Sequence, residues 1–538
     1  MALIIYGKYI FCIIIYNNIK ISKYKLPKIE VLTSKQVKLT IIDLQKRFNK
    51  SQFNIYLIFM VDEFKVEKLK KFVEIGINPY PYSYKKTRDS IEIINNFQEL
   101  NGKNERVAGR IIGIRKMGKI YFIDLLDFKG KLQIIVKSDS VQKKYFDIIE
   151  LCDVADIIGV NGKVTKTTRG EISIEAESIE ILAKSLRTLP EKFHGLKDTE
   201  QRYRKRHLDL IVNPKVREFF IIRSKILKYM REFLDDRGYI EFETPVLQEV
   251  YGGANAEPFI TKHNALNENR FLRISDELYL KRLIIGGFEK VYEVSKDFRN
   301  EDIDSTHNPE FTQIECYEAY KDYEDYMKMV EELLSGIVMK LFNTHKVTYQ
   351  GKELDFTPPF KRIYWVDELK KKSGIDVSKL NDNEAVEVAK NEKLDIKIKN
   401  SYHVADALFD KYIKPELFNP SFVLDFPAYM CPLTKDKRGN PKLSERFELY
   451  ITGREEGNCY SELTNPIEQR KKFEEQEQER KKGDEEAPPS DEEFLEAIEY
   501  GMPPTAGLGI SIDRLAMILT DNMSIKEVLA FPAMRKEK

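Results

Sequence analysis

Residues 291–301 read VYEVSKDFRNE, and residues 305–315 read STHNPEFTQIE. The alternation of apolar and polar residues in these two runs predicts two strands joined by a polar loop. Such a loop would present Arg299, Glu301 and His307 from one face. Because the forked guanidinium of arginine matches a phosphate or a carboxylate, we expect an anion-binding loop at the edge of a sheet. A structural salt bridge between Arg299 and Glu301 is the alternative.

Two further stretches extend this pattern. Residues 237–247, RGYIEFETPVL, take the end of a helix into a strand that stops at a proline. Residues 507–516, GLGISIDRLA, place two glycines, which allow close approach to the backbone, before a helix that carries Arg514. Phe311 could stack on a nucleotide base. Each stretch alone is common, so only the combination of the three indicates a nucleotide site.

A series of short strands occupies residues 103–185. Alternation predicts five strands, in RVAGRIIGIR, KIYFIDLLD, KLQIIVK, DIIGVNGKV and EISIEAESIEIL. Turn signals separate them at Met117-Gly118, Lys129-Gly130, Asn161-Gly162 and Arg169-Gly170. Five closely spaced strands predict a small β-barrel, and an OB-fold is the leading candidate. A short amphipathic helix ending before Gly76 is expected to precede the barrel.

Two apolar stripes predict long helices in the second half of the chain. The first is expected to start at Pro214, with Asn213 as its cap, and to end at Gly238. The second runs from Tyr326 to Leu341. Both are expected to pack in a core or an interface. Residues 467–493 are dense in charge of both signs and are expected to form a solvated helix and loop.

Composition limits the class of protein. At roughly 150 residues per domain, 538 residues predict two to three domains. With 88 Lys and Arg against 87 Asp and Glu, the net charge of +1 excludes a histone-like polycation and an acidic disordered chain. It does not exclude nucleic-acid binding through local patches. Five cysteines without a CxxC pair argue against a disulfide framework and a Cys-based zinc site, and fit a reducing compartment.

Residues 1–59 are basic, and their role stays open. The apolar run 10–16 is far shorter than the roughly 20 residues that span a bilayer. Neither a membrane anchor nor a secretory signal is therefore expected. The basic bias fits organelle targeting, or an arm that attracts tRNA. The third interpretation is that translation starts at Met60, which opens a well-patterned segment.

Together the three stretches resemble the three signature motifs of class II aminoacyl-tRNA synthetases, in the same order. Longer runs are similar to the class II lysyl-tRNA synthetase family (subclass IIb): RYRKRHLDLIVNP, GGANAEPFITKHNAL, RISDELYLKRLIIGGFEKVYEVSKDFRNE, THNPEFTQIE and GNCYSELTNP. The resemblance covers about residues 60–538. It implies an α+β protein with a mainly antiparallel catalytic sheet, flanking helices and an N-terminal β-barrel OB-fold.

The resemblance implies three regions. Residues 1–59 would be an extension, residues 60–190 a helix and an OB-fold that binds the anticodon, and residues 191–538 the catalytic domain. The implied activity is that of a lysine–tRNA ligase, which converts L-lysine and ATP to lysyl-adenylate and pyrophosphate and then transfers lysine to the 3′ end of tRNA(Lys). It also implies Mg²⁺, a homodimer joined partly through residues 237–247, and a cytoplasmic location. Organelle targeting by residues 1–59 is the alternative.

Carried over by motif position, the family pattern implies an ATP site. The implied ATP-binding residues are Arg299, Glu301, His307, Asn308, Phe311, Glu448, Glu455 and Arg514. Of these, Arg299, Glu301 and Arg514 would be the catalytic residues. Arg299 would hold the α-phosphate and the lysine carboxylate, and Glu301 would accept from the adenine amino group. Phe311 and Arg514 would sandwich adenine.

The family pattern also implies a metal site and departs from this sequence once. Glu448 and Glu455 would hold Mg²⁺, and hard carboxylate oxygens beside phosphates suit that ion. The family's third motif has a third glycine where this chain has Ser511. A hydroxymethyl group there could crowd the approach of ATP.

The implied lysine-binding residues are Gly253, Glu277, Glu315, Tyr317, Asn458, Tyr460 and Glu462. Their chemistry agrees with the sign of the substrate. Three carboxylates suit the two ammonium groups of lysine, and tyrosine rings suit its aliphatic stem. An aspartate pocket would instead show an unpaired lysine or arginine.

In the barrel, Phe122, Gln133 and Glu171 match family positions that read the anticodon. An aromatic ring can stack on an unstacked base, while amide and carboxylate groups read base edges. The alternative for Phe122 is a place in the barrel core.

Three other functions are considered. The first is a neighbouring synthetase for aspartate or asparagine, which the acidic pocket disfavours. The second is a catalytically silent tRNA-binding or scaffold protein, for which Ser511 is the single indication. The third is an enzyme that adds lysine to protein, whose members usually lack the barrel domain predicted here.

Overall fold

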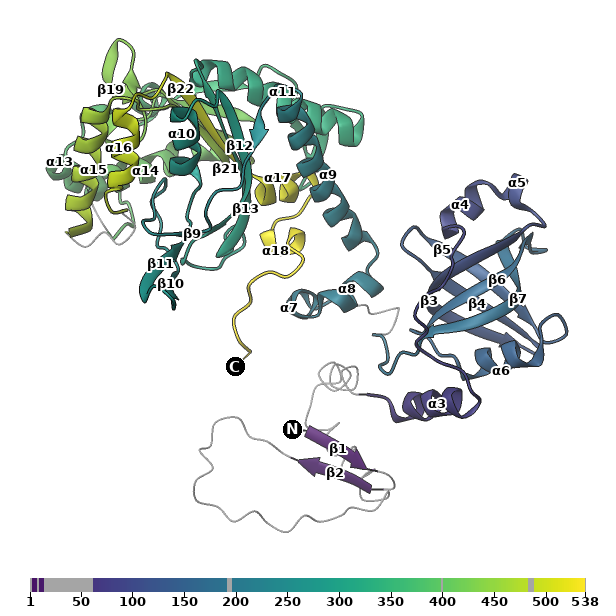
Figure 1. Cartoon of the computed structure of the whole chain (residues 1–538). Helices are drawn as coiled ribbons and strands as arrows, with labels where there is room; N and C mark the ends of the chain where they lie inside the picture. The colour runs from purple at the N-terminus through teal and green to yellow at the C-terminus, as the bar shows by residue number, and fades with distance from the viewer. Residues whose placement is uncertain are drawn as a thin grey trace, which may run out of the picture. The chain divides into compact units, whose positions relative to one another are not determined.

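The structure is a computed structural model of the whole chain. It describes residues 2–6, 9–13, 61–190, 196–397, 400–481 and 488–537. The chain forms two compact units, residues 1–195 and 196–538 (Figure 1). At the N-terminus, β1 (Ala2–Tyr6) and β2 (Tyr9–Ile13) pair antiparallel. The other predictions made for residues 1–59 lie outside the described residues. Within the described ranges, no helix combines the length and apolar character needed to cross a bilayer.

The first unit contains a closed five-stranded barrel, as predicted. Its strands are β3 (Asn104–Met117), β4 (Ile120–Leu126), β5 (Lys131–Lys137), β6 (Ile157–Lys166) and β7 (Ile172–Ala183), closed in the order β3-β4-β5-β7-β6. β5 and β7 pair parallel, and the other pairs are antiparallel. Alternate side chains, including Ile123, Ile134 and Ile174, fill the interior and are fully buried.

Helices accompany the barrel. α3 (Glu63–Glu74) is the predicted amphipathic helix, and α4 (Ser90–Asn95) and α5 (Phe97–Leu100) follow it. α6 (Lys143–Leu151), between β5 and β6, was not predicted. The predicted turn at Asn161-Gly162 is wrong, because both residues lie inside β6, where the register with β7 shifts. A Cβ at Gly162 would lie 2.1 Å from the Glu175 carbonyl oxygen, so glycine serves close strand approach here.

The second unit is built on an eight-stranded, mainly antiparallel sheet. Its order is β16 (Lys361–Tyr364), β17 (Ser421–Leu424), β20 (Arg446–Ile451), β21 (Arg454–Ser461), β22 (Thr505–Ser511), β13 (Glu310–Ala319), β12 (Lys290–Phe298) and β8 (Ile240–Glu241). The two edge pairs, β16–β17 and β12–β8, are parallel. The smaller sheets are formed by β9 (Leu247–Gln248) with β10 (Ile260–His263) and β11 (Glu268–Leu272), by β14 (Lys346–Tyr349) with β15 (Lys352–Asp355), and by β18 (Asp436–Lys437) with β19 (Asn440–Ser444).

Helices cover both faces of the large sheet. α9 (Lys215–Asp235), α11 (Tyr323–Phe342) and α17 (Ile512–Leu519) gather on one side (Figure 1) and share the main core with it. α10 (Glu277–Ile285), α15 (Pro466–Lys481) and α16 (Glu492–Glu499) lie on the other side. The remaining helices are α7 (Thr199–Arg204), α8 (Arg206–Val212), α12 (Trp365–Ser373), α13 (Asp382–Asn391), α14 (Ser401–Tyr412) and α18 (Ile525–Val528).

The two long apolar helices are confirmed as α9 and α11, with two corrections elsewhere. Asn213 does not cap α9: its amide donates to Asp209 Oδ1 at 2.7 Å, and Pro214 is the N-cap. The expectation of a solvated helix in residues 467–493 is wrong for one face of α15. Gln469 and Phe473 are buried there, and Phe473 packs with Phe494 of α16.

Candidate active site

The floor of the site is a patch of the large sheet centred on β22. Alternation along this strand points Leu508 and Ile510 into the core, so Gly507 and Gly509 face the other way. Gly507 pairs with Tyr317 on one side and Tyr460 on the other, and Gly509 pairs with Glu315 and Asn458. The two glycines therefore form a flat strip between two rows of functional side chains.

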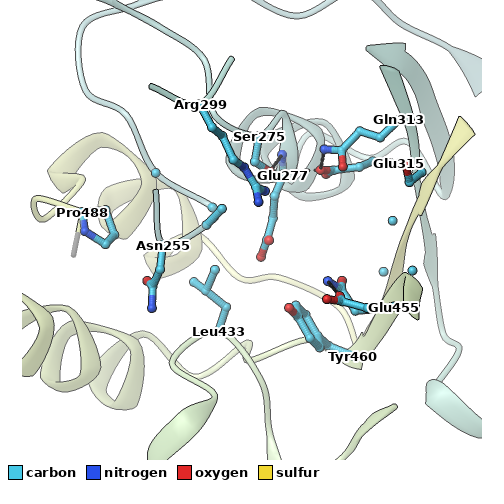
Figure 2. Close-up of a pocket in the computed structure, with 18 of the residues that line it drawn as sticks. Asn255, Ser275, Glu277, Arg299, Gln313, Glu315, Leu433, Glu455, Tyr460 and Pro488 are labelled. Atoms are coloured by element: carbon cyan, nitrogen blue, oxygen red, sulfur yellow. Dashed lines mark hydrogen bonds between the residues drawn. The ribbon is translucent and has the colours of Figure 1, made fainter. Parts of the chain in front are cut away.

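A cavity of about 390 Å³ lies over this floor. All predicted ATP and lysine residues except Glu448 line it: Gly253, Glu277, Arg299, Glu301, His307, Asn308, Phe311, Glu315, Tyr317, Glu455, Asn458, Tyr460, Glu462 and Arg514. Figure 2 shows Arg299 and Glu277 pointing into the cavity from one wall, with Tyr460 and Glu455 on the opposite wall. Residues that lie up to 261 positions apart in the sequence, from Gly253 to Arg514, thus share one space.

Arg299 follows directly on β12 and is available to an anion. Its backbone N–H donates to the Pro309 carbonyl at 2.9 Å, which fixes the start of the loop. Its guanidinium carbon lies 5.2 Å from the centre of the Phe311 ring. Among the described residues no ion pair joins it to Glu301, and its Nε has no hydrogen-bond partner. The salt-bridge alternative is therefore not what the structure contains.

His307 is held by a residue that the sequence analysis missed. Asp304 Oδ2 lies 2.8 Å from His307 Nδ1, and Asp304 Oδ1 accepts the His307 backbone N–H at 2.7 Å. Although burial raises the pKa of the Asp304 carboxyl, His307 and backbone N–H groups outweigh it and lower that pKa. His307 Nε2 lies 3.2 Å from an Arg514 terminal nitrogen. Asn308 also lines the cavity, but its amide is bonded to the backbone of Glu310 and Ala533.

Arg514 sits one turn into α17 and is fixed from three sides. Its side chain donates to the Glu455 carbonyl at 2.7 Å and contacts His307. Its backbone N–H donates to Ser511 Oγ at 3.3 Å, so Ser511 is the N-cap of α17. The hydroxyl that departs from the family pattern thus has a bonding role at the end of the helix.

Glu315 stands at the centre of the acidic end of the cavity. Its carboxylate accepts from Ser275 Oγ at 3.0 Å, Gln313 Nε2 at 2.6 Å and Tyr317 Oη at 3.0 Å. Burial raises its pKa to about 8, and burial likewise raises the pKa of Glu462 to about 8. Burial thus opposes ionisation of both carboxyls, and cationic groups bound beside them would favour the ionised forms.

A second cluster of carboxylates lies against the acidic end of the cavity. Carboxylate oxygens of Asp276, Asp297 and Glu315 all lie within 4.8 Å of one another, a spacing that could hold a metal ion. Arg273 Nε already lies 3.2 Å from Asp297 Oδ1. Burial raises the pKa of Asp276 well above its usual value and that of Asp297 to about 6. Arg273 thus offsets part of the charge of this group, and its carboxylate oxygens are candidate ligands for a cation.

Of the two glutamates predicted to hold Mg²⁺, only one lines the cavity. Glu455 lines the cavity, with Oε1 3.3 Å from the Asn458 amide. Glu448 lies across the β20–β21 hairpin, but Arg446 contacts one of its oxygens and Tyr450 Oη donates to the other at 2.9 Å. Burial raises the pKa of Glu448 to about 7. Glu455 therefore fits a hard cation, whereas Glu448 fits one only after Arg446 releases it.

Several lining residues were missed by the sequence analysis. Asn255, Leu433, Phe473 and Pro488 also line the cavity, and Figure 2 labels three of them. Ser275 lies within a run whose similarity to the family was noted, and its position before Glu277 was an available signal. Phe473 was hidden in a charged stretch, where one buried aromatic ring gives no periodic pattern.

The predicted anticodon residues lie on β4, on β5 and before β7. Phe122 is partly exposed, on the face of β4 opposite the buried Tyr121 and Ile123, so the barrel-core alternative is wrong. Gln133 is buried, and its Oε1 accepts from Ser173 Oγ at 3.1 Å. Its strand partner is Asp124, two residues from Phe122 on the same face. Glu171 is exposed at the start of β7.

Known protein families match the two units of the chain separately. A family described as tRNA synthetases class II (D, K and N) matches residues 198–535, and an OB-fold nucleic acid binding domain matches residues 105–182. A lysine–tRNA ligase of Clostridium perfringens is 48% identical over 479 residues, which cover 88% of this chain and 95% of that protein. The lysine–tRNA ligase of Carboxydothermus hydrogenoformans is 47% identical over 474 residues, covering 88% and 97%. Lysine–tRNA ligase 2 of Methanosarcina mazei is 48% identical over 483 residues, covering 88% and 94%.

Proposed function

The chain belongs to the lysine–tRNA ligase family of class II aminoacyl-tRNA synthetases, and from this premise we propose that it activates L-lysine with ATP and transfers it to tRNA(Lys). One observation carries the choice of substrate. A single cavity is lined by the guanidinium of Arg299 together with the carboxylates of Glu277, Glu315 and Glu462. A free carboxylate with two ammonium groups matches that distribution of charge.

The first step is the formation of lysyl-adenylate. An oxygen of the lysine carboxylate attacks the α-phosphorus of ATP, the bond from that phosphorus to the bridging oxygen breaks, and pyrophosphate leaves. Arg299 holds the two reacting anions together, and Arg514, fixed on α17, faces the nucleotide. No protein nucleophile takes part, so positioning and charge neutralisation carry the catalysis.

We propose the remaining ATP contacts on the basis of the family pattern. Phe311 and Arg514 enclose the adenine ring, Glu301 accepts from its amino group, and His307 contacts the phosphates. Asn308 supports the loop through its backbone bonds and contacts the nucleotide from there. Mg²⁺ bound with ATP would offset phosphate charge, with Glu455 as its protein ligand and Glu448 as a second once Arg446 is displaced.

The second step transfers lysine to tRNA. The ribose 3′-hydroxyl oxygen at the end of tRNA(Lys) attacks the acyl carbon of the adenylate, AMP leaves with the phosphate oxygen, and the hydroxyl proton is released. We assign residues 191–538 to this chemistry and residues 60–190 to anticodon binding. Phe122 would stack on a base, and Gln133 and Glu171 would read base edges. Arg115, the strand partner of Phe122, and Lys131 are both at least half exposed; they pair with Asp124 in the structure and would supply positive charge for the RNA.

We further propose a homodimer and a cytoplasmic location. Ile240 on β8, at the edge of the large sheet, is 48% exposed, and Val246, just before β9, and Leu247, at its start, are 39 and 52% exposed; a second copy would bury all three. Sedimentation of a monomer at micromolar concentration would contradict the dimer. Four buried free cysteines fit a reducing compartment, and cell fractionation would test the location.

The role of Arg299 is tested by pyrophosphate exchange. Arg299→Ala is expected to cut lysine-dependent exchange by orders of magnitude, because the attacking carboxylate loses its cationic partner. Arg470→Ala is the control, since Arg470 lies on the surface of α15, where its ion-pair partners among the described residues are Glu492 and Glu499. Near-normal exchange by Arg299→Ala would remove this residue from the mechanism.

A further inference from the structure

Lys281 lies directly behind the amino-acid end of the cavity. It is fully buried on α10, one turn after Glu277, and its Nζ lies 2.5 Å from Glu277 Oε1. The same ammonium forms an ion pair with Glu462 Oε2. Lys281 does not itself line the cavity, whereas both of its carboxylate partners do. It therefore contacts the two glutamates from the side away from any bound amino acid.

The ammonium of Lys281 stays charged in this position. Burial by itself lowers the pKa of a lysine, but the facing carboxylates of Glu277 and Glu462 outweigh it and raise the pKa of Lys281. A buried ammonium with two carboxylate partners is a fixed ion, whereas either carboxylate without it would be a buried charge lacking its partner.

The charges of the three glutamates that line this end and of Lys281 behind them can be counted. Glu277, Glu315 and Glu462 contribute three carboxylates, and Lys281 contributes one ammonium. When all are ionised, the net charge is −2. L-lysine brings two ammonium groups, and its carboxylate faces Arg299. Without Lys281 the same pocket would carry −3 against the two positive charges of the substrate.

We propose that Lys281 is a positioning residue that holds Glu277 and Glu462 and sets the charge of the pocket to match an amino acid with two ammonium groups. The assignment rests on the proposed function, because the count takes lysine as the substrate. It adds a specificity determinant that never contacts the substrate. An amino acid with one ammonium group would leave one buried carboxylate without a partner.

The test replaces Lys281 with methionine, which is similar in length and uncharged. In pyrophosphate exchange with the full-length protein, K281M is expected to raise KM for lysine about tenfold or more, because Glu277 and Glu462 lose their shared partner. KM for ATP is expected to stay within about threefold of the original value, since neither partner of Lys281, Glu277 or Glu462, is among the residues assigned to ATP. If Lys281 only filled space, K281M would lower the melting temperature without raising KM for lysine more than KM for ATP.

A matched control exists in the barrel. Lys184 is also fully buried between two carboxylates, with Nζ 2.6 Å from Asp153 and 2.8 Å from Asp156. K184M removes a similar buried ion pair outside the catalytic unit. It is expected to lower the melting temperature, as K281M does, and to leave KM for lysine unchanged.

A double variant separates charge from packing. If Lys281 acts through Glu462, K281M and E462Q share part of their effect, and K281M/E462Q raises KM for lysine by clearly less than the product of the two single changes. This comparison also serves if K281M folds poorly, because removing both ions relieves the buried unpaired charge.

The outcomes are distinct. An unchanged KM for lysine in K281M, or strictly multiplicative effects in the double variant, would overturn the role of Lys281. Absence of lysine-dependent exchange in the unmodified protein would instead overturn the proposed function. Exchange with lysine by the unmodified protein, together with the lysine-specific KM increase in K281M, would support both.

Discussion

At the scale of single residues, Ser511 shows how a departure from the family pattern is accommodated. The family resemblance implies a glycine at this position, and a hydroxymethyl group could have crowded ATP. In the structure Ser511 Oγ accepts the Arg514 backbone N–H at 3.3 Å and caps α17. Ser511 lines the cavity, but its hydroxyl oxygen is held against the helix end.

We predict that Ser511→Ala lowers the free energy of unfolding by about 1 kcal/mol and that Ser511→Gly lowers it by only a few tenths, because glycine is the better replacement at a helix N-cap. KM for ATP should stay within about twofold in both variants, since neither removes an ATP contact. Urea denaturation and pyrophosphate exchange measure the two quantities. A marked fall in KM for ATP in Ser511→Gly would mean that the serine does crowd the nucleotide.

The two high-pKa carboxyls predict a pH dependence of lysine binding. Burial raises the pKa values of Glu315 and Glu462 to about 8, and a bound ammonium requires both to be ionised. Lysine binding should therefore release protons, and affinity should rise from pH 6 to 8, by up to about tenfold per pH unit for each proton released. Calorimetry in buffers of different ionisation enthalpy measures both effects.

The same shifts affect stability in the opposite direction. The unfolded glutamates ionise near pH 4.5, while the folded ones keep their protons to about pH 8. The free energy of unfolding of the lysine-free protein should thus fall as the pH rises from 5 to 8. Glu462→Gln is the control and should flatten both dependences. A lysine affinity that does not change between pH 6 and 8 would contradict the assignment of the pocket.

At the scale of elements, β22 determines where the site can lie. A strand in the middle of a sheet normally carries side chains on both faces, but Gly507 and Gly509 leave one face of β22 bare. The side chains of β13 and β21 converge over that strip. The Gly-Leu-Gly pattern was visible in the sequence, whereas the rows on either side of it depend on strand order, which the sequence alone does not determine.

Gly507→Ala should damage the lysine end of the site. A Cβ there would lie 2.2 Å from Glu462 Oε1 and 2.3 Å from Tyr317 Cε1, so both buried side chains must move. We expect KM for lysine to rise about tenfold or more. Gly509→Ala is the matched control on the same strand, because its nearest neighbours would be 3.7 Å away, an ordinary contact. Equal effects of the two substitutions would argue against this geometry.

The barrel predicts a separable tRNA defect. Phe122 is partly exposed on β4, so Phe122→Ala should leave pyrophosphate exchange unchanged and lower kcat/KM for tRNA charging roughly tenfold or more, the usual effect of losing one stacked base. Phe128, which is 62% exposed on the adjacent loop, supplies the control variant. A drop in melting temperature without a change in tRNA charging would place Phe122 in a structural role instead.

Elements were predictable where the pattern is local. The five barrel strands and the helices α9 and α11 have clear periodicity, and the structure contains them. Asn161-Gly162 carried a turn signal, but its place inside β6 depends on pairing with β7. The buried face of α15 was missed because two buried residues in a charged helix leave no apolar stripe.

At the scale of the whole molecule, the site is assembled from distant segments. The motifs predicted 14 of the residues that line the cavity, since each motif carries its own recognisable residues. They could not show that Arg446 forms an ion pair with Glu448. Nor could they show that Lys281 pairs with Glu462, because these two residues are 181 positions apart in the sequence and come into contact only in the folded unit. Functional residues were thus more predictable than the buried partners that hold them.

The most direct measurement is ATP–pyrophosphate exchange by the purified full-length protein with each standard amino acid in turn. Exchange that depends on L-lysine, and on no other amino acid to a comparable extent, is the predicted result, because only lysine offers two ammonium groups to the three glutamates and a carboxylate to Arg299. Exchange with aspartate or asparagine, or no exchange with any amino acid by folded protein that still binds tRNA, would contradict it.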